Sequence, residues 1–149
     1  ILMKRTVTSF FDKEYLEYAK YVVENRAIPS CIDGLKPTQR KVVYIANKIW
    51  KTGNEKPMKL FQLAGRVAAE AFYHHGNTSL ESSMVGMAQK FKNSLPLLEG
   101  IGQFGSLRSP SAGAPRYISA KLHPNFRLLY QDFEFLYSPV AVSKTLKIA

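Results

Sequence analysis

Hydrophobic side chains recur every three or four positions near the start of the chain, and this spacing predicts helices. Residues 10–27 show it first, and Asp12 is a suitable N-cap for that helix. Breaker residues around Gly34 end the pattern. Pro37 then suits the first turn of a second helix, which stops at Gly53.

Two more stretches repeat the helical spacing further along the chain. Residues 58–73 place leucine, valine and alanine on one face, which predicts a third helix. A fourth helix begins near Asn77 and runs to residue 91. The tight turn at 73–77 joins these two helices, so we expect them to form a helix–turn–helix pair.

The pattern changes after the fourth helix. Residues 93–115 carry four glycines and predict a long loop, and the alternating stretch 116–122 predicts a strand. A short helix is expected over residues 124–135. A helix pair followed by a loop and a strand is typical of a winged helix-turn-helix, which places its second helix in the major groove. We therefore expect a mainly helical α+β fold with a small β wing.

The length of 149 residues fits one domain with an ordinary core. We assign residues 1–9 to an N-terminal extension and residues 10–136 to the winged-helix domain. Residues 137–149 form a tail that we assign to neither.

The charge balance narrows the range of partners. Lys and Arg total 21 and Asp and Glu total 11, which leaves a formal charge of +10. A field of this sign attracts polyanions, and nucleic acid is the commonest such partner. The alternative is a basic fragment of a larger, better balanced protein. A single cysteine, no apolar run of membrane-spanning length and no signal-peptide pattern favour an intracellular protein without a membrane partner.

The pair Arg116–Tyr117 follows a flexible loop and is the most distinctive local feature. An ordinary phenol is a weak nucleophile near neutral pH, so its attack on a phosphodiester needs a base or a lowered pKa. Such attack also needs cations to offset the charge on the phosphoryl oxygens, and Arg116 supplies one. On the motif alone, such a pair is usually structural.

Further candidates for phosphate contact lie at helix starts. Lys36, Arg40 and Lys41 surround the opening of the second helix, where a phosphate would be favoured, although a solvated basic face is the simpler reading. His74 and His75 sit at the turn before the fourth helix. One of them contacts a phosphate or bonds to the backbone, and both readings stay open.

Two apparent motifs are set aside. Residues 100–105 match the glycine pattern of dinucleotide-binding loops, but they lead to a strand and not to a helix. Adjacent histidines point apart on a helix and no third ligand lies nearby, so we predict no metal site in this chain.

Four blocks together resemble one family, the type IIA DNA topoisomerases. These blocks cover residues 24–44, 73–91, 97–106 and 114–122, in the family's order and spacing. The resemblance is to the DNA breakage–reunion region. The amino-acid sequences of these motifs resemble those of the eukaryotic, viral and T-even-type phage enzymes more than those of bacterial gyrase. This resemblance favours a separate subunit of the phage kind.

The resemblance implies specific roles for residues of this chain. Tyr117 matches the nucleophile that forms a 5′-phosphotyrosyl link to cleaved DNA, and Arg116 matches the arginine that assists at the scissile phosphate. Arg26 and His75 match the other members of that constellation. Residues 77–90 match the family's groove helix, the helix that enters the major groove. DNA contacts are expected from the basic cluster, from the turn at residues 73–77 and from the groove helix: Lys36, Arg40, Lys41, His74, Asn77, Ser79 and Ser82.

The resemblance also implies what the chain works with. Its substrate is double-stranded DNA, and a second copy cuts the other strand, so we expect a homodimer. Mg²⁺ is held by toprim carboxylates outside this chain, and ATP binds to another region. The setting is the cytoplasm of a bacterial host for a phage protein, or the nucleus for a eukaryotic one.

The alternative from another class is a non-catalytic winged-helix DNA-binding protein. It explains the charge and the helices, but it does not explain Arg116–Tyr117 at its spacing from residues 102–106. An RNA-binding module ranks last, because most aromatic residues fall on apolar helical stripes.

Overall fold

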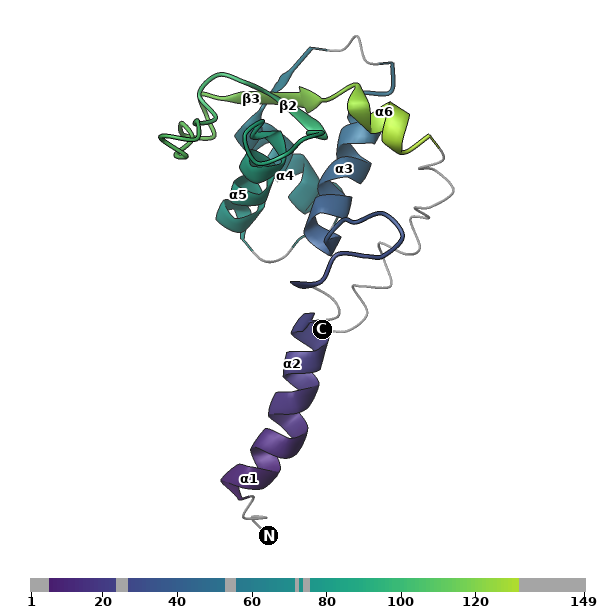
Figure 1. Cartoon of the computed structure of the whole chain (residues 1–149), viewed down its shortest axis with the longest axis vertical. Coiled ribbons are helices and arrows are strands. Elements are labelled where there is room, and N and C mark those ends of the chain that lie inside the picture. The colour runs from purple at the N-terminus through teal and green to yellow at the C-terminus, as the bar shows by residue number, and fades with distance from the viewer. Residues whose placement is uncertain (1–5, 24–26, 53–55, 72, 74–75, 132–149) are drawn as a thin grey trace. The chain divides into compact units, whose positions relative to one another are not determined.

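The computed structural model describes residues 6–23, 27–52, 56–71, 73 and 76–131 (Figure 1). The chain divides into two compact units, Ile1–Pro37 and Thr38–Ala149. Within the described ranges, no helix has the length and apolar character needed to cross a membrane.

The first unit contains a helical segment in three successive parts. These are α1 (Val7–Phe10), a π-helical turn η1 (Phe11–Tyr15) and α2 (Leu16–Val22). The prediction of Asp12 as the N-cap is wrong, because Asp12 lies inside η1. Thr6 is the N-cap instead, since its Oγ1 accepts a hydrogen bond of 3.3 Å from the Ser9 N–H.

Three helices form most of the second unit, and all three were predicted. They are α3 (Pro37–Ile49), α4 (Leu60–Glu70) and α5 (Asn77–Ala88), and α4 packs against α5. The buried side chains recur at the spacing seen in the sequence: Val42, Val43, Ile45 and Ala46 on α3, Leu60, Leu63, Ala64 and Val67 on α4, and Leu80, Met84, Met87 and Ala88 on α5. This burial is the main source of their stability.

A three-stranded antiparallel sheet completes the unit, with strand order β1-β3-β2. The strands are β1 (Met58–Lys59), β2 (Leu98–Ile101) and β3 (Ser119–Leu122). Met58 pairs with Ala120, and Leu98 pairs with Leu122. A strand was predicted over residues 116–122, and β3 forms its second part, whereas Arg116 and Tyr117 lie in a turn. The strands β1 and β2 were not predicted.

Two sequence expectations are therefore corrected. Residues 58 and 59 form β1 and do not open a helix, and residues 98–101 form β2 within the expected loop. Both short strands exist because β3 offers an edge on each side, and that pairing partner lies far away in the sequence. The last helix, α6 (Asn125–Leu129), matches the start of the predicted 124–135 helix, whose end lies outside the described residues.

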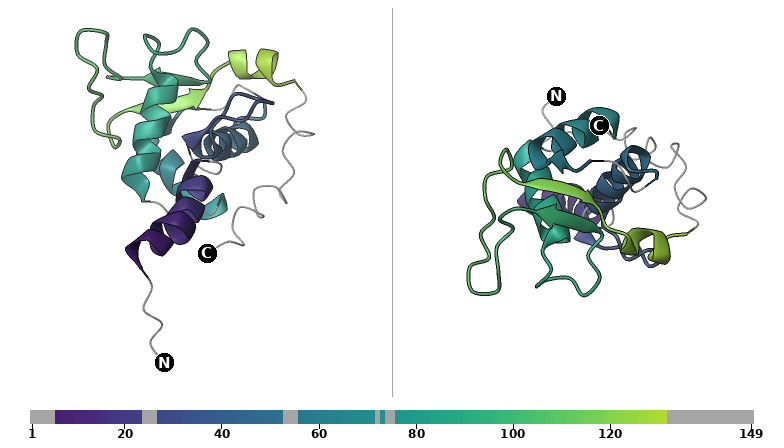
Figure 2. Two further views of the ribbon diagram at one scale, coloured as in Figure 1. Left: turned by 60° about the horizontal axis from the view of Figure 1, so that its bottom comes forward. Right: turned by 90° about the horizontal axis from the view of Figure 1, so that it is seen from above.

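The sheet lies across one end of α4 and α5 (Figure 1). The chain leaves β2, returns beside α5 and then enters β3, and two further views follow this return (Figure 2). Helices packed beside a small antiparallel sheet confirm the α+β class. The returning loop, and not a helix or a strand, carries the chain to Arg116 and Tyr117.

Candidate nucleic-acid interface

Arg116 and Tyr117 lie on an exposed turn immediately before β3. The Tyr117 side chain is 70% exposed, and within the described residues its hydroxyl makes no hydrogen bond. The Arg116 guanidinium carbon lies 4.9 Å from the centroid of the Tyr117 ring, in a cation–π contact. The phenol therefore faces solvent with a fixed positive charge beside it.

Backbone bonds hold this turn in place. The Tyr117 N–H donates to the Ala114 carbonyl at 2.9 Å, and the Phe61 N–H of α4 donates to the Pro115 carbonyl at 3.3 Å. The Leu60 N–H donates to the Ile118 carbonyl at 3.1 Å. The first turn of α4 leaves N–H groups without helical partners, and two of them anchor the chain on either side of Tyr117.

Lys59 is a second cation at this turn, and it was not among the residues predicted from the sequence. Its Nζ donates to the Tyr117 carbonyl oxygen at 2.9 Å, across a separation of 58 residues. The ammonium therefore lies beside the backbone of Tyr117. The only signal in the sequence was its basic character, which many other residues share.

One face of the amino-terminal half of α5 is exposed and polar, while Leu80 of the same segment is buried. Asn77, Ser79 and Ser82, which were predicted to contact DNA, all have exposed side chains. Gly76 precedes the helix with a φ of +88°, a conformation that glycine adopts readily. In this arrangement the helix presents its first turn to solvent, where N–H groups favour an anion.

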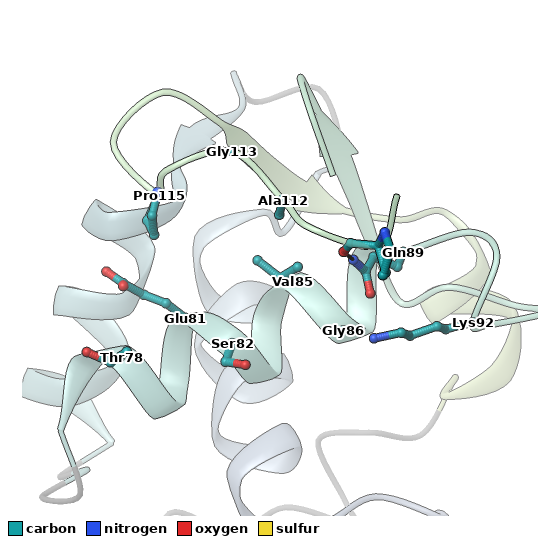
Figure 3. Close-up of a pocket in the computed structure, with 11 residues that line it drawn as sticks. Thr78, Glu81, Ser82, Val85, Gly86, Gln89, Lys92, Ala112, Gly113 and Pro115 are labelled. Carbon is teal, nitrogen blue, oxygen red and sulfur yellow. Dashed lines mark hydrogen bonds between the residues drawn. The ribbon is translucent and has the colours of Figure 1, made fainter. Parts of the chain in front are cut away.

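A groove of about 380 Å³ separates α5 from the loop that leads to Tyr117. Figure 3 shows Val85 of α5 opposite Ala112, while Glu81 extends toward Pro115. Thr78 and Ser82 line the same groove as Pro115, which directly precedes Arg116. The structure thus places the predicted groove helix α5 beside the loop that leads to Tyr117, although Tyr117 is not among the residues that line the groove.

Lys41 and Ser79 are linked through a buried tyrosine. The Lys41 Nζ lies 5.9 Å from the Tyr73 ring centroid, and the Tyr73 hydroxyl donates to the Ser79 Oγ at 3.3 Å. Partial burial lowers the pKa of the Lys41 ammonium. Lys41 of α3 and the start of α5 therefore belong to one connected patch.

Five other residues were predicted to contact DNA or to take part in catalysis. Arg40 is half-buried on α3, and Lys36 is exposed in the first unit. Arg26, His74 and His75 lie outside the described residues. Among the residues that the structure does describe, no group of three or more His, Cys, Asp or Glu could hold a metal ion.

The glycine pattern at residues 100–105 does not open a helix. Gly100 lies in β2, and Gly102 and Gly105 lie in the loop after it with φ values of +111° and +84°. This context differs from that of a dinucleotide-binding loop, which has a helix N-terminus at its end.

Comparison with known proteins identifies the family. The family model of the A subunit of DNA gyrase and topoisomerase IV matches residues 26–136. The DNA topoisomerase medium subunit of Enterobacteria phage T4 is 44% identical over 143 residues, which is 96% of this chain and 32% of the relative. The mitochondrial DNA topoisomerase 2 of Dictyostelium discoideum is 45% identical over 87% of this chain and 10% of the relative.

A bacterial relative completes the comparison. The A subunit of DNA topoisomerase 4 from Neisseria gonorrhoeae is 38% identical over 83% of this chain and 16% of its own length. The chain thus spans about a third or less of these relatives. The resemblance expected from the four sequence blocks is confirmed, and the chain belongs to the type IIA DNA topoisomerases, in the family of the gyrase and topoisomerase IV A subunits.

Proposed function

We propose that this chain is the DNA-cleaving and religating part of a type II topoisomerase, with Tyr117 as its nucleophile. The observation that carries the proposal is the exposed phenol of Tyr117 beneath the Arg116 guanidinium, on a turn anchored to α4. Family membership supports the reaction class. We also infer that residues 10–136 form a winged-helix domain, in which α4 and α5 are the helix pair and the sheet is the wing.

The reaction proceeds by exchange of one phosphodiester for another. The Tyr117 oxygen gives up its proton and attacks a DNA phosphorus, and the bond to the 3′-oxygen breaks. The 3′-oxygen takes up a proton, and the 5′-phosphate stays on the tyrosine. Because one phosphoester replaces another, the reverse attack reseals the strand without a new energy source.

The cations around the turn give this step its electrostatic support. Arg116 offsets the charge that grows on the phosphoryl oxygens, and Lys59 adds positive charge on the backbone side of Tyr117. Arg26 and His75 are proposed to complete this constellation. The half-buried Lys41, together with Lys36 and Arg40, is proposed to bind the flanking duplex.

The remaining DNA contacts are proposed for the start of α5. Asn77, Ser79 and Ser82 are exposed there, and His74 precedes them in the chain. Contacts of this kind to phosphates would set the position of the duplex against the groove without reading its sequence.

The complete enzyme is proposed to need more than this chain. Mg²⁺ would be held by toprim carboxylates elsewhere, and ATP would bind to a further region. A second copy would cut the opposite strand a few bases away. We place the protein inside cells, in a bacterial host if it is of phage origin.

The test is Tyr117→Phe in the enzyme reconstituted with its toprim and ATPase parts and Mg²⁺. Phe keeps the ring under Arg116 but has no oxygen to form the phosphoester. We expect the covalent protein–DNA adduct to disappear while duplex binding is kept. Unchanged adduct formation would reject the proposal and favour the non-catalytic DNA-binding protein.

A further inference from the structure

Gln89 follows directly after α5 and is buried, with only 2% of its surface exposed. Its Nε2 donates to the Phe104 carbonyl at 2.8 Å and to the Pro110 carbonyl at 3.0 Å. Two carbonyl oxygens can face only the nitrogen of an amide, because its oxygen has no proton to donate. A single side chain therefore joins the two ends of the segment 105–109.

Other bonds continue this closure along the loop. The Ser106 N–H donates to the Ser109 carbonyl at 2.8 Å, and the Gly113 N–H donates to the Gln103 carbonyl at 2.8 Å. A Cβ on Gly105 would lie 2.8 Å from the Pro110 carbonyl. The two limbs of the loop are thus in close contact where Gln89 holds them.

The same loop leads directly to the candidate nucleophile. Pro110 is followed after a short stretch by Pro115, whose carbonyl is bonded to the start of α4. Tyr117 comes next but one, with its own N–H bonded to Ala114. The turn is therefore anchored to α4 on one side, while Gln89 anchors the incoming chain to the end of α5.

The hydrogen-bonding capacity of the Gln89 amide is only partly used. Its Oε1 is buried and, among the described residues, has no hydrogen-bond partner. An unpaired buried acceptor lowers stability, and an apolar side chain of this size would avoid it. What the amide provides, and an apolar side chain does not, is the pair of N–H donors to the loop.

We propose that Gln89 is a positioning residue for Tyr117, which couples the DNA-facing helix α5 to the loop that carries the nucleophile. Figure 3 shows Gln89 at the end of α5, beside the groove that this helix shares with residues 110–115. In this arrangement, Gln89 at the C-terminal end of α5 sets the position of the turn that carries Tyr117. A duplex bound along α5 would therefore meet Tyr117 in a position that depends on the same helix. This inference rests on the proposed role of Tyr117.

The main test compares Gln89→Met with Asn93→Leu in the reconstituted enzyme. Met has a similar length but no donor. Asn93 is the matched control, since its Nδ2 donates to the Gly86 and Gln89 carbonyls at 2.7 and 2.9 Å at the same helix end, and among the described residues its side chain makes no hydrogen bond to the loop. For Gln89→Met we expect a tenfold or greater loss in the rate of adduct formation at saturating DNA, with DNA affinity within twofold.

Amide hydrogen exchange provides a readout that does not depend on catalysis. In the Gln89→Met chain the Gly113 amide should exchange at least tenfold faster, and in Asn93→Leu it should change less than twofold. An unchanged adduct rate in Gln89→Met, or an equal loss in Asn93→Leu, overturns the proposal. If Tyr117→Phe abolishes the adduct while Gln89→Met does not reduce it, this inference fails and the proposed function stands.

A second variant keeps the proposal testable if Gln89→Met does not fold. In Gln89→Glu the carboxylate faces two carbonyls, and only its protonated form can donate to one of them. The adduct rate relative to wild type at the same pH should therefore rise as pH falls. A ratio that does not change with pH overturns the proposal.

Discussion

Gly105 allows the loop before Tyr117 to close on itself, and replacing it with alanine should be severely destabilising. Its φ is +84°, in the region that L side chains rarely adopt. An added Cβ would lie 2.8 Å from the Pro110 carbonyl carbon and oxygen and 2.9 Å from the Ser109 oxygen. These are backbone atoms, and Pro110 is held by Gln89, so they cannot turn away as a side chain could.

The size of the effect follows from two contributions. The left-handed conformation costs a residue with a Cβ about 1–2 kcal/mol. Crowding against fixed neighbours adds about 1–3 kcal/mol. We therefore expect Gly105→Ala to lower the free energy of unfolding by about 2–5 kcal/mol, a large part of the roughly 5–15 kcal/mol typical of a domain.

Gly65 is the matched control for this substitution. It lies on the exposed face of α4, has no left-handed φ, and a Cβ there would meet nothing within 4 Å. Gly65→Ala should raise stability by about 1 kcal/mol through helix propensity. Urea unfolding followed by the fluorescence of Trp50, the single and buried tryptophan, measures both variants. A Gly105→Ala midpoint at or above that of the wild type would refute the reasoning.

Three further predictions concern the core and the charges. Leu63→Ala, at a fully buried position, should lower the free energy of unfolding by about 2–5 kcal/mol, whereas Leu107→Ala, at a position 83% exposed, should leave it unchanged in the same assay. Lys41→Met should weaken duplex binding and reduce the slope of log affinity against log salt by about 1. Burial lowers the pKa of Lys41 in the folded state, so the unfolded state binds more protons at alkaline pH. The free energy of unfolding of the wild type should therefore rise with pH in that range. Lys41→Met should lack this contribution. The exposed Glu70 pairs with Lys48 at 2.8 Å, which lowers the pKa of the carboxyl; Glu70→Gln should cause no measurable change near pH 7, and any small difference from wild type should vanish as pH falls through the folded-state pKa of Glu70.

The helices of the second unit could be predicted because their signal is local. The apolar residues that α3, α4 and α5 bury recur within each helix at the helical period, so a short window of sequence contains the information. The four sequence blocks likewise identified the family and pointed to Arg116 and Tyr117, because the residues of each motif and the order of the motifs can be read from the sequence alone.

The short strands and the supporting residues could not be read in this way. β1 and β2 form only because β3 pairs with both, and the sequence does not indicate that pairing. Lys59 meets Tyr117 across 58 residues, and Gln89 meets Phe104 and Pro110 across 15 and 21. One lysine or one glutamine carries no local mark of such a role.

The amino-acid order was therefore sufficient for the helices of the core, the basic character, the family and the residue proposed to react. Folding was needed to place that residue on an exposed turn, to bring Lys59 beside it and to join its loop to α5 through Gln89. The physical reason is range: helical periodicity and motifs act over a few residues, whereas strand pairing and buried hydrogen bonds join groups that become neighbours only when the chain packs.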